Sequence, residues 1–342
     1  MKAVIFRRHG GPDVLEYIDV PDPQIGEAEV LVRVKACSVN HLDIWLRQGI
    51  AAYAIRLPHI VGSDVAGIVE RVGSGVGRVK TGDSVILTPG LHCGQCSFCQ
   101  AGQDNRCDSY GIRGAKTDGG YAEFVTAHSR ELMPLPASMD FETAAAFPLV
   151  FLTAWHMLVT RAKLQAGQRL LVHAAGSGIG HAAIQIAKHL KATVYATVGS
   201  DAKIPKAKAL GADEVINYSR EDFETSIRAL TDGHGVDVVF EHVGPSTWQG
   251  SLKLLAKGGR VVTCGATSGP SVALDLRYLF SRHLSILGSM MGTHEELKTV
   301  TGLVARSVLR PVIDAVFPLR ESRIAQERML RREVFGKLIL IP

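Results

Sequence analysis

Short apolar runs alternate with helical stretches after residue 168, and this alternation constrains the fold more than any other feature of the chain. Strands are predicted at residues 170–172, 193–198, 214–216, 236–240 and 260–263. Helices are predicted between them, at residues 182–190, 203–210, 222–230 and 252–255. Units that alternate at this spacing form a parallel sheet with helical crossovers. This part of the chain is therefore predicted to be a doubly wound α/β domain.

The turn after the first of these strands is rich in glycine and reads Ala-Gly-Ser-Gly-Ile-Gly. Such a turn lets backbone N–H groups approach a pyrophosphate, and the N-terminus of the next helix stabilises its charge. Ala175 and Ser177 stand where the strict dinucleotide fingerprint has its first two glycines, so the surrounding β/α units carry much of the argument. A turn dictated by packing alone is the alternative. The residues predicted to bind the dinucleotide here are Ala175, Gly176, Ser177, Gly178, Ile179 and Gly180.

The tip of the second strand bears on the choice between NADH and NADPH. An NAD-binding domain places a carboxylate there, which accepts from the ribose 2′-hydroxyl. This chain has Gly199 and Ser200 at that point, and Asp201 follows where it is predicted to cap the next helix. Ser200 and Lys203 could donate to a 2′-phosphate, although Lys203 could equally be an exposed helix lysine. The sequence thus favours NADPH, bound in part by Gly199, Ser200 and Lys203.

Four of the six cysteines lie in one short segment, at Cys93, Cys96, Cys99 and Cys107. Clustering of this kind favours a metal over disulfides, and the spacing suits a tetrahedral zinc ion. Ferredoxin-type clusters use a different spacing around their fourth cysteine. Because four thiolates leave no coordination position open, the prediction is one structural zinc per chain.

The part of the chain before position 130 reads mainly as strands and turns. Residues 29–36 alternate with period two, and residues 65–72 and 84–87 are apolar runs bounded by glycine-rich turns. An antiparallel, barrel-like domain is expected there. The 342 residues of the chain are enough for about two domains.

Charge and hydropathy exclude several classes of function. The net charge is +5 and no run of five basic residues occurs, so no nucleic-acid partner is expected. No apolar stretch reaches the roughly 18 residues of a membrane span, so no membrane partner is expected. The N-terminal segment becomes charged where a signal peptide needs its apolar core. A cytoplasmic protein with a small-molecule substrate is expected.

The cysteine lobe, the β-rich first part, the nucleotide fold and a return to mixed structure at the end together resemble the medium-chain dehydrogenase/reductase superfamily. The resemblance covers essentially the whole chain. It implies a GroES-like β-barrel catalytic domain at residues 1–147 and 288–342, with the zinc lobe at about 90–110. It also implies a Rossmann domain at residues 148–287, with the active site in the cleft between the two.

Zinc alcohol dehydrogenases of this superfamily carry a second, catalytic zinc, which is held by Cys, His and Cys. In this sequence the three positions hold Asn40, Ser63 and Leu149. These side chains cannot form a tight zinc site, because zinc prefers thiolate, imidazole or carboxylate. A rearranged site remains as an alternative, using Cys37, His41, His59 and Asp64.

Without that zinc, the pattern resembles the quinone oxidoreductase branch of the superfamily. Members of this branch transfer hydride from NADPH to quinones or to activated C=C bonds of enones and enals. The alternative is a zinc-type alcohol dehydrogenase that interconverts alcohols with aldehydes or ketones. Non-enzymatic relatives that serve as lens proteins or bind RNA form a third class. The resemblance also implies a homodimer or homotetramer, formed through the edge strand at residues 284–288.

The resemblance assigns further cofactor contacts. Lys203 and Tyr218 would contact the 2′-phosphate, and Thr153 would face the nicotinamide. The residues expected to position the nicotinamide carboxamide are Gly265, Ala266, Thr267, Ser289 and Met290.

Catalytic candidates follow from the need to stabilise an enolate oxygen without a metal, which hydrogen-bond donors can do. Asn40 is the leading donor, with His41 beside it, although Asn40 could instead be a cap at the end of a strand. Asp43 could orient His41 or shuttle a proton, and Tyr53 or water could supply the proton. Structural roles for His41, Asp43 and Tyr53 are the alternative.

Overall fold

The computed structural model describes residues 1–51 and 53–342, which form two compact units. One unit comprises Met1–Leu149, Thr293–Ala305 and Pro311–Pro342. The other comprises Val150–Gly292 and Arg306–Arg310. Within the described part of the chain, no helix combines the length and apolar character that a membrane crossing requires.

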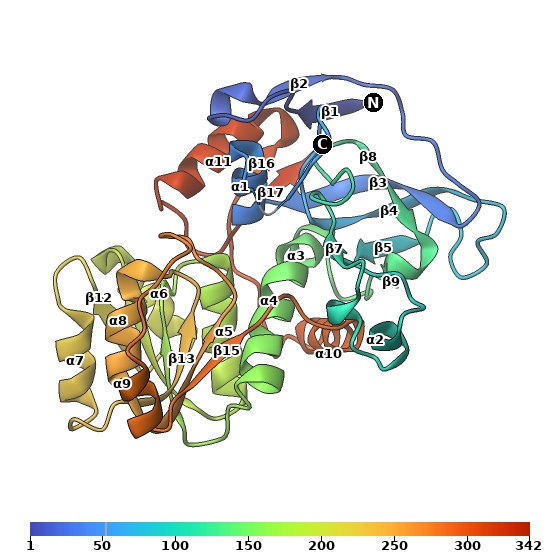
Figure 1. Cartoon of the computed structure of the whole chain (residues 1–342). Coiled ribbons are helices and arrows are strands. Elements are labelled where there is room, and N and C mark those ends of the chain that lie inside the picture. The colour runs from blue at the N-terminus through green and yellow to red at the C-terminus, as the bar shows by residue number, and fades with distance from the viewer. Residues whose placement is uncertain (52) are drawn as a thin grey trace. The chain divides into compact units, whose positions relative to one another are not determined.

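The second unit is built on a six-stranded sheet in which every neighbouring pair is parallel, as the alternating pattern predicts (Figure 1). In pairing order its strands are β12 (Glu214–Asn217), β11 (Thr193–Val198), β10 (Arg169–Val172), β13 (Val236–Glu241), β14 (Leu255–Thr263) and β15 (Ser285–Gly288). The chain runs outward from β10 in both directions, so the strand order reverses between β10 and β13. Doubly wound sheets bind their ligands at this reversal, beyond the carboxyl ends of the strands.

Helices connect these strands, and all but the last of them bury apolar side chains. They are α5 (Gly178–His189), α6 (Ile204–Ala209), α7 (Phe223–Leu230), α8 (Pro245–Leu254) and α9 (Leu276–Ser281). A helix and a π-helical segment, α4 (Pro148–Trp155) and His156–Arg161, precede β10. The Asp222 carboxylate caps α7 by accepting from the backbone N–H of Thr225 at 2.8 Å. Leu171, Val239 and Val261 are fully buried in the core between sheet and helices.

The first unit is built on a seven-stranded sheet that is antiparallel except where β16 pairs with β17. In pairing order its strands are β16 (Ile313–Pro318), β17 (Lys337–Ile341), β3 (Glu29–Ser38), β4 (Asp64–Val72), β5 (Ser84–Leu87) and β9 (Leu132–Pro134), and β8 (Phe124–His128) also pairs with β3. Two short pairs accompany it, β1 (Lys2–Ile5) with β2 (Glu16–Asp19) and β6 (Gly90–Leu91) with β7 (Gly111–Ile112).

The register of this sheet brings three distant segments together. Ser38, the last residue of β3, lies opposite Asp64 on β4 and opposite Ile339 on β17. The helices of this unit are α1 (His41–Gln48), α2 (Ser97–Gln100), α3 (Phe141–Ala146), α10 (His294–Ala305) and α11 (Ser322–Leu330). Helix α1 begins shortly after β3 ends, so its N-terminus lies at this junction.

Candidate functional site

The glycine-rich turn lies between β10 and α5, as predicted. Ser177 is the N-cap of α5, and its hydroxyl accepts from the backbone N–H of Gly180 at 2.9 Å. A Cβ at Gly180 would lie only 2.3 Å from the carbonyl oxygen of Ala174, so glycine lets the helix pack this closely. A twelve-residue helix whose N-terminus follows the central strand fits the pyrophosphate of a dinucleotide.

The tips of β11 and β12 form the second part of the expected cofactor site. A Cβ at Gly199 would lie 2.6 Å from the hydroxyl oxygen of Tyr218, which places the two residues in contact. The Asp201 carboxylate accepts from Asn217 Nδ2 at 2.6 Å and pairs with Arg220 Nη1 at 2.6 Å. Asp201 is therefore not the helix cap that the sequence predicts, because the N-cap position of the following turn is Ser200. Sequence reasoning missed Arg220, which carries no motif of its own.

The segments after β14 and β15 contain the residues assigned to the nicotinamide. The Thr267 hydroxyl donates to the carbonyl oxygen of His242 at 3.0 Å, and the Ser289 N–H donates to the carbonyl oxygen of Thr263 at 2.9 Å. The Ser289 hydroxyl is buried and has no partner among the described residues. A buried polar atom without a partner fits a ligand group such as a carboxamide. The Thr153 hydroxyl lies 3.6 Å from Met291 Sδ, one residue beyond Met290.

The four clustered cysteines converge as predicted, with their sulfur atoms all within 4.8 Å of one another. Cys93 Sγ lies 3.5 Å from Cys107 Sγ and 3.9 Å from Cys99 Sγ. A tetrahedral zinc with Zn–S bonds near 2.3 Å separates its sulfurs by about 3.8 Å, so the arrangement is compatible with zinc. Backbone N–H groups of Gln95 and Cys96 donate to Cys93 Sγ and lower the pKa of this thiol.

The cysteine lobe is anchored to the rest of its unit by contacts that sequence reasoning missed. The buried Asp104 carboxylate accepts from the backbone N–H of His294, at the start of α10, at 3.0 and 3.2 Å. Arg130 Nη1 donates to the carbonyl oxygen of Cys93 at 3.2 Å. His294 lies 190 positions beyond Asp104 in the sequence, so no local pattern announces the first of these contacts.

The junction of β3, β4 and β17 contains a buried polar cluster around Asn40, which we call the Lys337 cluster (Ser38, Asn40, Asp64, Lys337 and the backbone N–H of Leu149). Asp64 Oδ2 accepts from Asn40 Nδ2 at 2.9 Å and from Ser38 at 3.0 Å. Lys337 Nζ donates to Asn40 Oδ1 at 2.6 Å and to Asp64 Oδ2 at 3.3 Å. Asp64 Oδ1 accepts from Leu149 N–H at 2.8 Å.

The cluster is almost sealed from solvent. Asp64 is fully buried, Lys337 is 1% exposed and Asn40 is 5% exposed. Asn40 occupies the N-cap position of α1, yet its side chain reaches Asp64 and Lys337. Ser63, which stands at the sequence position of the missing histidine ligand, is fully buried, and its hydroxyl has no partner in the described part of the chain.

Asp43 is fully buried beside this cluster. Its carboxylate accepts from the backbone N–H groups of Asn40 (2.7 Å) and Gly62 (3.1 Å) and from the Tyr121 hydroxyl (3.1 Å). Burial raises the pKa of the Asp43 carboxyl to about 7, against the lowering effect of these hydrogen bonds. The predicted orientation of His41 by Asp43 is not among these contacts, and Asp43 instead fixes the backbone of Asn40.

The remaining catalytic candidates lie nearby in the chain. The His41 ring packs edge-on against Trp45 with centroids 5.4 Å apart. Tyr53 is half-buried, and burial raises the pKa of its hydroxyl, which keeps the hydroxyl protonated at neutral pH. His59 contacts Gly114 and Asp118, so it is engaged away from the Lys337 cluster. Over residues 1–51 and 53–342, the cysteine cluster alone brings three or more metal-binding side chains together, and Cys37, His41, His59 and Asp64 form no such group.

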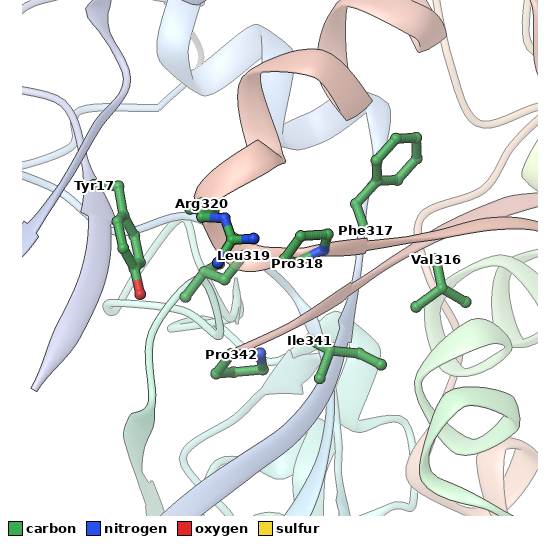
Figure 2. Close-up of a pocket in the computed structure, with 8 residues that line it drawn as sticks. All are labelled: Tyr17, Val316, Phe317, Pro318, Leu319, Arg320, Ile341 and Pro342. Carbon is green, nitrogen blue, oxygen red and sulfur yellow. The ribbon is translucent and has the colours of Figure 1, made fainter.

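A surface hollow near the carboxyl end of β17 is a separate feature of the first unit (Figure 2). Its lining residues are Tyr17, Val316, Phe317, Pro318, Leu319, Arg320, Ile341 and Pro342. None of them is a predicted site residue, and Arg320 is the one charged side chain in this lining. It therefore offers no acid–base pair or ligand set.

Comparison with known proteins identifies the family. Two family models match the chain, an alcohol dehydrogenase GroES-like domain over residues 26–137 and a zinc-binding dehydrogenase over residues 178–306. The quinone oxidoreductase of Pseudomonas aeruginosa is 34% identical over 350 residues, covering 100% of this chain and 99% of the relative. The chain belongs to the medium-chain dehydrogenase/reductase superfamily. This confirms the family and the two-part fold that the sequence predicts.

Solved structures of this superfamily differ in their stated activity. A structure described as an NAD-dependent alcohol dehydrogenase has a TM-score of 0.95 and 45% identity, over 100% of both chains. The Escherichia coli quinone oxidoreductase, complexed with NADPH, has a TM-score of 0.86 and 30% identity, over 100% of both chains. This medium-chain dehydrogenase/reductase is accordingly an oxidoreductase that uses a pyridine nucleotide.

Proposed function

We propose that this protein transfers hydride from NADPH to a quinone or to an activated C=C bond, without a catalytic metal. The Lys337 cluster carries the proposal. Where an alcohol dehydrogenase of this superfamily would bind zinc, the chain presents an amide and a lysine–carboxylate pair, all buried.

The cluster is chemically unsuited to zinc. Asn40, Ser63 and Leu149 supply none of the thiolates and imidazoles that the ion prefers. Asp64 is the one strong ligand in the group, and the Lys337 ammonium already lies 3.3 Å from its Oδ2. A divalent ion at the same carboxylate would be repelled by this ammonium.

Hydride addition to an enone places negative charge on the carbonyl oxygen. The nicotinamide, when bound, supplies the hydride, and the chain must stabilise the resulting enolate. The Asn40 amide is the donor we assign to this oxygen, because Asp64 and Lys337 hold it in one orientation. A proton is then added at the carbon next to the carbonyl group. Tyr53, whose hydroxyl stays protonated at neutral pH, or water supplies it.

The tips of β11 and β12 support NADPH as the cofactor. Arg220 and Asn217 occupy the Asp201 carboxylate, so this acid is not free to repel a 2′-phosphate. Lys203 and Tyr218 lie in the same two segments and are the proposed phosphate contacts. The glycine-rich turn is proposed to bind the pyrophosphate.

The first experiment measures the zinc content per chain by elemental analysis, and steady-state assays follow it. One zinc together with NADPH-dependent reduction of but-3-en-2-one or 1,4-benzoquinone, corrected for the rate without enzyme, is the expected result. The saturated ketone should be identified by mass. Two zinc ions together with oxidation of alcohols would contradict the proposal.

A zinc-type alcohol dehydrogenase is the second candidate, and the 45% identity to a protein described as an NAD-dependent alcohol dehydrogenase favours it. It predicts alcohol oxidation that is lost when a second zinc is removed by a chelator. It also predicts NADH affinity at least equal to NADPH affinity. These two measurements separate the candidates without knowledge of the physiological substrate.

We further propose that the protein forms a homodimer or homotetramer through β15. Among the described residues this strand is the last of its sheet and pairs with β14 on one side, so its outer edge is proposed to pair with a second copy. Light scattering coupled to size-exclusion chromatography should give two or four chains. Substitution of Ile286 by proline should reduce that number.

A further inference from the structure

The proposed mechanism assigns Asn40 to the substrate oxygen, and the buried Lys337 contacts the side chain of this residue. Lys337 is the first residue of β17, 297 positions from Asn40, and its Nζ donates to Asn40 Oδ1 at 2.6 Å. Burying an ammonium is costly unless it is paired, so a lysine kept at 1% exposure requires a compensating contact. Asp64 supplies that compensation, and Asn40 receives the shortest contact of the ammonium.

We propose that Lys337 is a positioning residue for the reduction, because its ammonium fixes the Asn40 amide and strengthens the N–H that this amide donates to the substrate oxygen. The proposal rests on the function proposed above. It assigns to a covalently attached cation the electrostatic role that a zinc ion plays elsewhere in the superfamily.

The orientation of the Asn40 amide follows from the chemistry of its two partners, Lys337 and Asp64. Lysine only donates, so the Asn40 atom that faces Nζ must be the carbonyl oxygen. A carboxylate only accepts, so the atom that faces Asp64 Oδ2 must be the amide nitrogen. The amide nitrogen carries two hydrogens, and Asp64 is its one acceptor among the described residues. The second hydrogen is the one that we assign to the substrate.

The Asn40 N–H becomes a stronger donor because the Lys337 ammonium polarises the amide group. A positive charge at the carbonyl end of an amide draws electron density toward the oxygen, which leaves the N–H hydrogens more positive. The effect is large here because the group is buried and water does not screen it. Lys337 also balances the charge of Asp64, which would otherwise repel the enolate oxygen that forms beside it.

The test is a set of variants measured for turnover of but-3-en-2-one. Lys337→Met should lower kcat by about 100-fold while the Kd for NADPH stays unchanged, because one donor to a developing oxyanion is worth about this factor. Lys337→Met combined with Asp64→Asn removes both charges and should restore the melting temperature but not kcat. If kcat recovers with stability, Lys337 serves only to pair with Asp64 and the proposal is overturned.

A double-mutant cycle tests whether Lys337 acts through Asn40. Asn40→Ala alone should lower kcat by about 100-fold. Adding Lys337→Met to Asn40→Ala should lower it less than threefold further, because the two residues act as one unit. Independent, multiplicative losses would overturn the proposal. The matched control is Arg113→Met, which breaks a buried pair with Glu131 (2.7 Å) in the same unit and should reduce stability with kcat unchanged.

A measurement without substrate separates this proposal from the proposed function. The Asn40 side-chain amide resonances, identified by their loss in Asn40→Ala, should shift in Lys337→Met and remain in Arg113→Met. Unchanged resonances in Lys337→Met overturn the positioning role, whatever the enzyme reduces. A wild-type protein that fails to reduce enones and quinones overturns the proposed function, and the resonances still report on the role of Lys337.

Discussion

The cysteine lobe and the Lys337 cluster lie in the same unit, and both contain negatively charged groups that a cation would balance. They differ in where this cation comes from. The lobe gathers four sulfurs from one short segment, and a zinc ion bound from solution would hold them as thiolates. The Lys337 cluster gathers residues from β3, β4 and β17, and its cation is part of the chain. A cation bound from solution can be removed and replaced, whereas a lysine is present whenever the strand is folded.

Metal removal should give the largest effect and acts on the lobe alone. A strong chelator or Cys96→Ser should release the zinc and destabilise the first unit by several kcal/mol, because binding of structural zinc is worth on the order of 10 kcal/mol. Zinc content and the thermal midpoint measure this. Re-added zinc should restore the chelated protein. A chelated protein with an unchanged midpoint would show that the lobe folds without metal.

Breaking the Lys337 cluster should have the next largest effect. Asp64→Asn leaves a buried ammonium without its carboxylate and should cost about 3–5 kcal/mol in the free energy of unfolding. Denaturant titration measures this, and zinc content should not change. Glu70→Gln is the control, because the Arg33–Glu70 pair is partly exposed and should cost at most about 1 kcal/mol. Equal losses in the two variants would remove the distinction between buried and exposed pairs.

The neighbouring Asp43 should make stability depend on pH. Burial raises the pKa of its carboxyl to about 7, so below that pH the folded protein binds a proton that the unfolded chain does not bind until about pH 4. This contribution therefore grows as pH falls from 7 toward 4, by up to about 1.4 kcal/mol per pH unit. The stability lost in Asp43→Asn should accordingly be greater at pH 5 than at pH 8. Urea titrations at both values test the sign, and the opposite order would refute it.

The smallest expected effect concerns Lys203, which is proposed to contact the 2′-phosphate of the cofactor. Lys203→Ala should weaken NADPH binding about tenfold, or about 1.4 kcal/mol, through loss of a charge-assisted hydrogen bond to the 2′-phosphate. NADH affinity should be unchanged. Fluorescence titration of both cofactors measures this, with Lys253→Ala, an exposed lysine on α8, as the control. Equal weakening of NADH binding would show that Lys203 does not contact the 2′-phosphate.

The parts of the molecule that sequence reasoning could predict are those encoded by neighbours in the chain. The glycine-rich turn needs only a strand, a few small residues and a helix, and the four cysteines need only their spacing. The sequence predicts the ends of helices and strands less accurately. The helix predicted at residues 252–255 is the last turn of α8, which begins at Pro245, and Leu255 already starts β14.

The candidate site was only partly predictable because its decisive contacts are long-range. Asn40 and Asp43 could be selected from their place after a strand, but nothing near them in sequence indicates Lys337 or Tyr121. A lysine beginning a late strand looks like any exposed strand-end lysine until the pairing of β17 with β3 buries it. The Asp104–His294 contact was hidden for the same reason.

The position of Lys337 on β17 also has a consequence for biosynthesis. Asn40 and Asp64 leave the ribosome long before Lys337, which follows Asn40 by 297 positions. Until β17 inserts between β3 and β16, a folded first sheet would enclose a carboxylate with no counter-charge. The closing of this junction is thus disfavoured in a nascent chain that does not yet include β17.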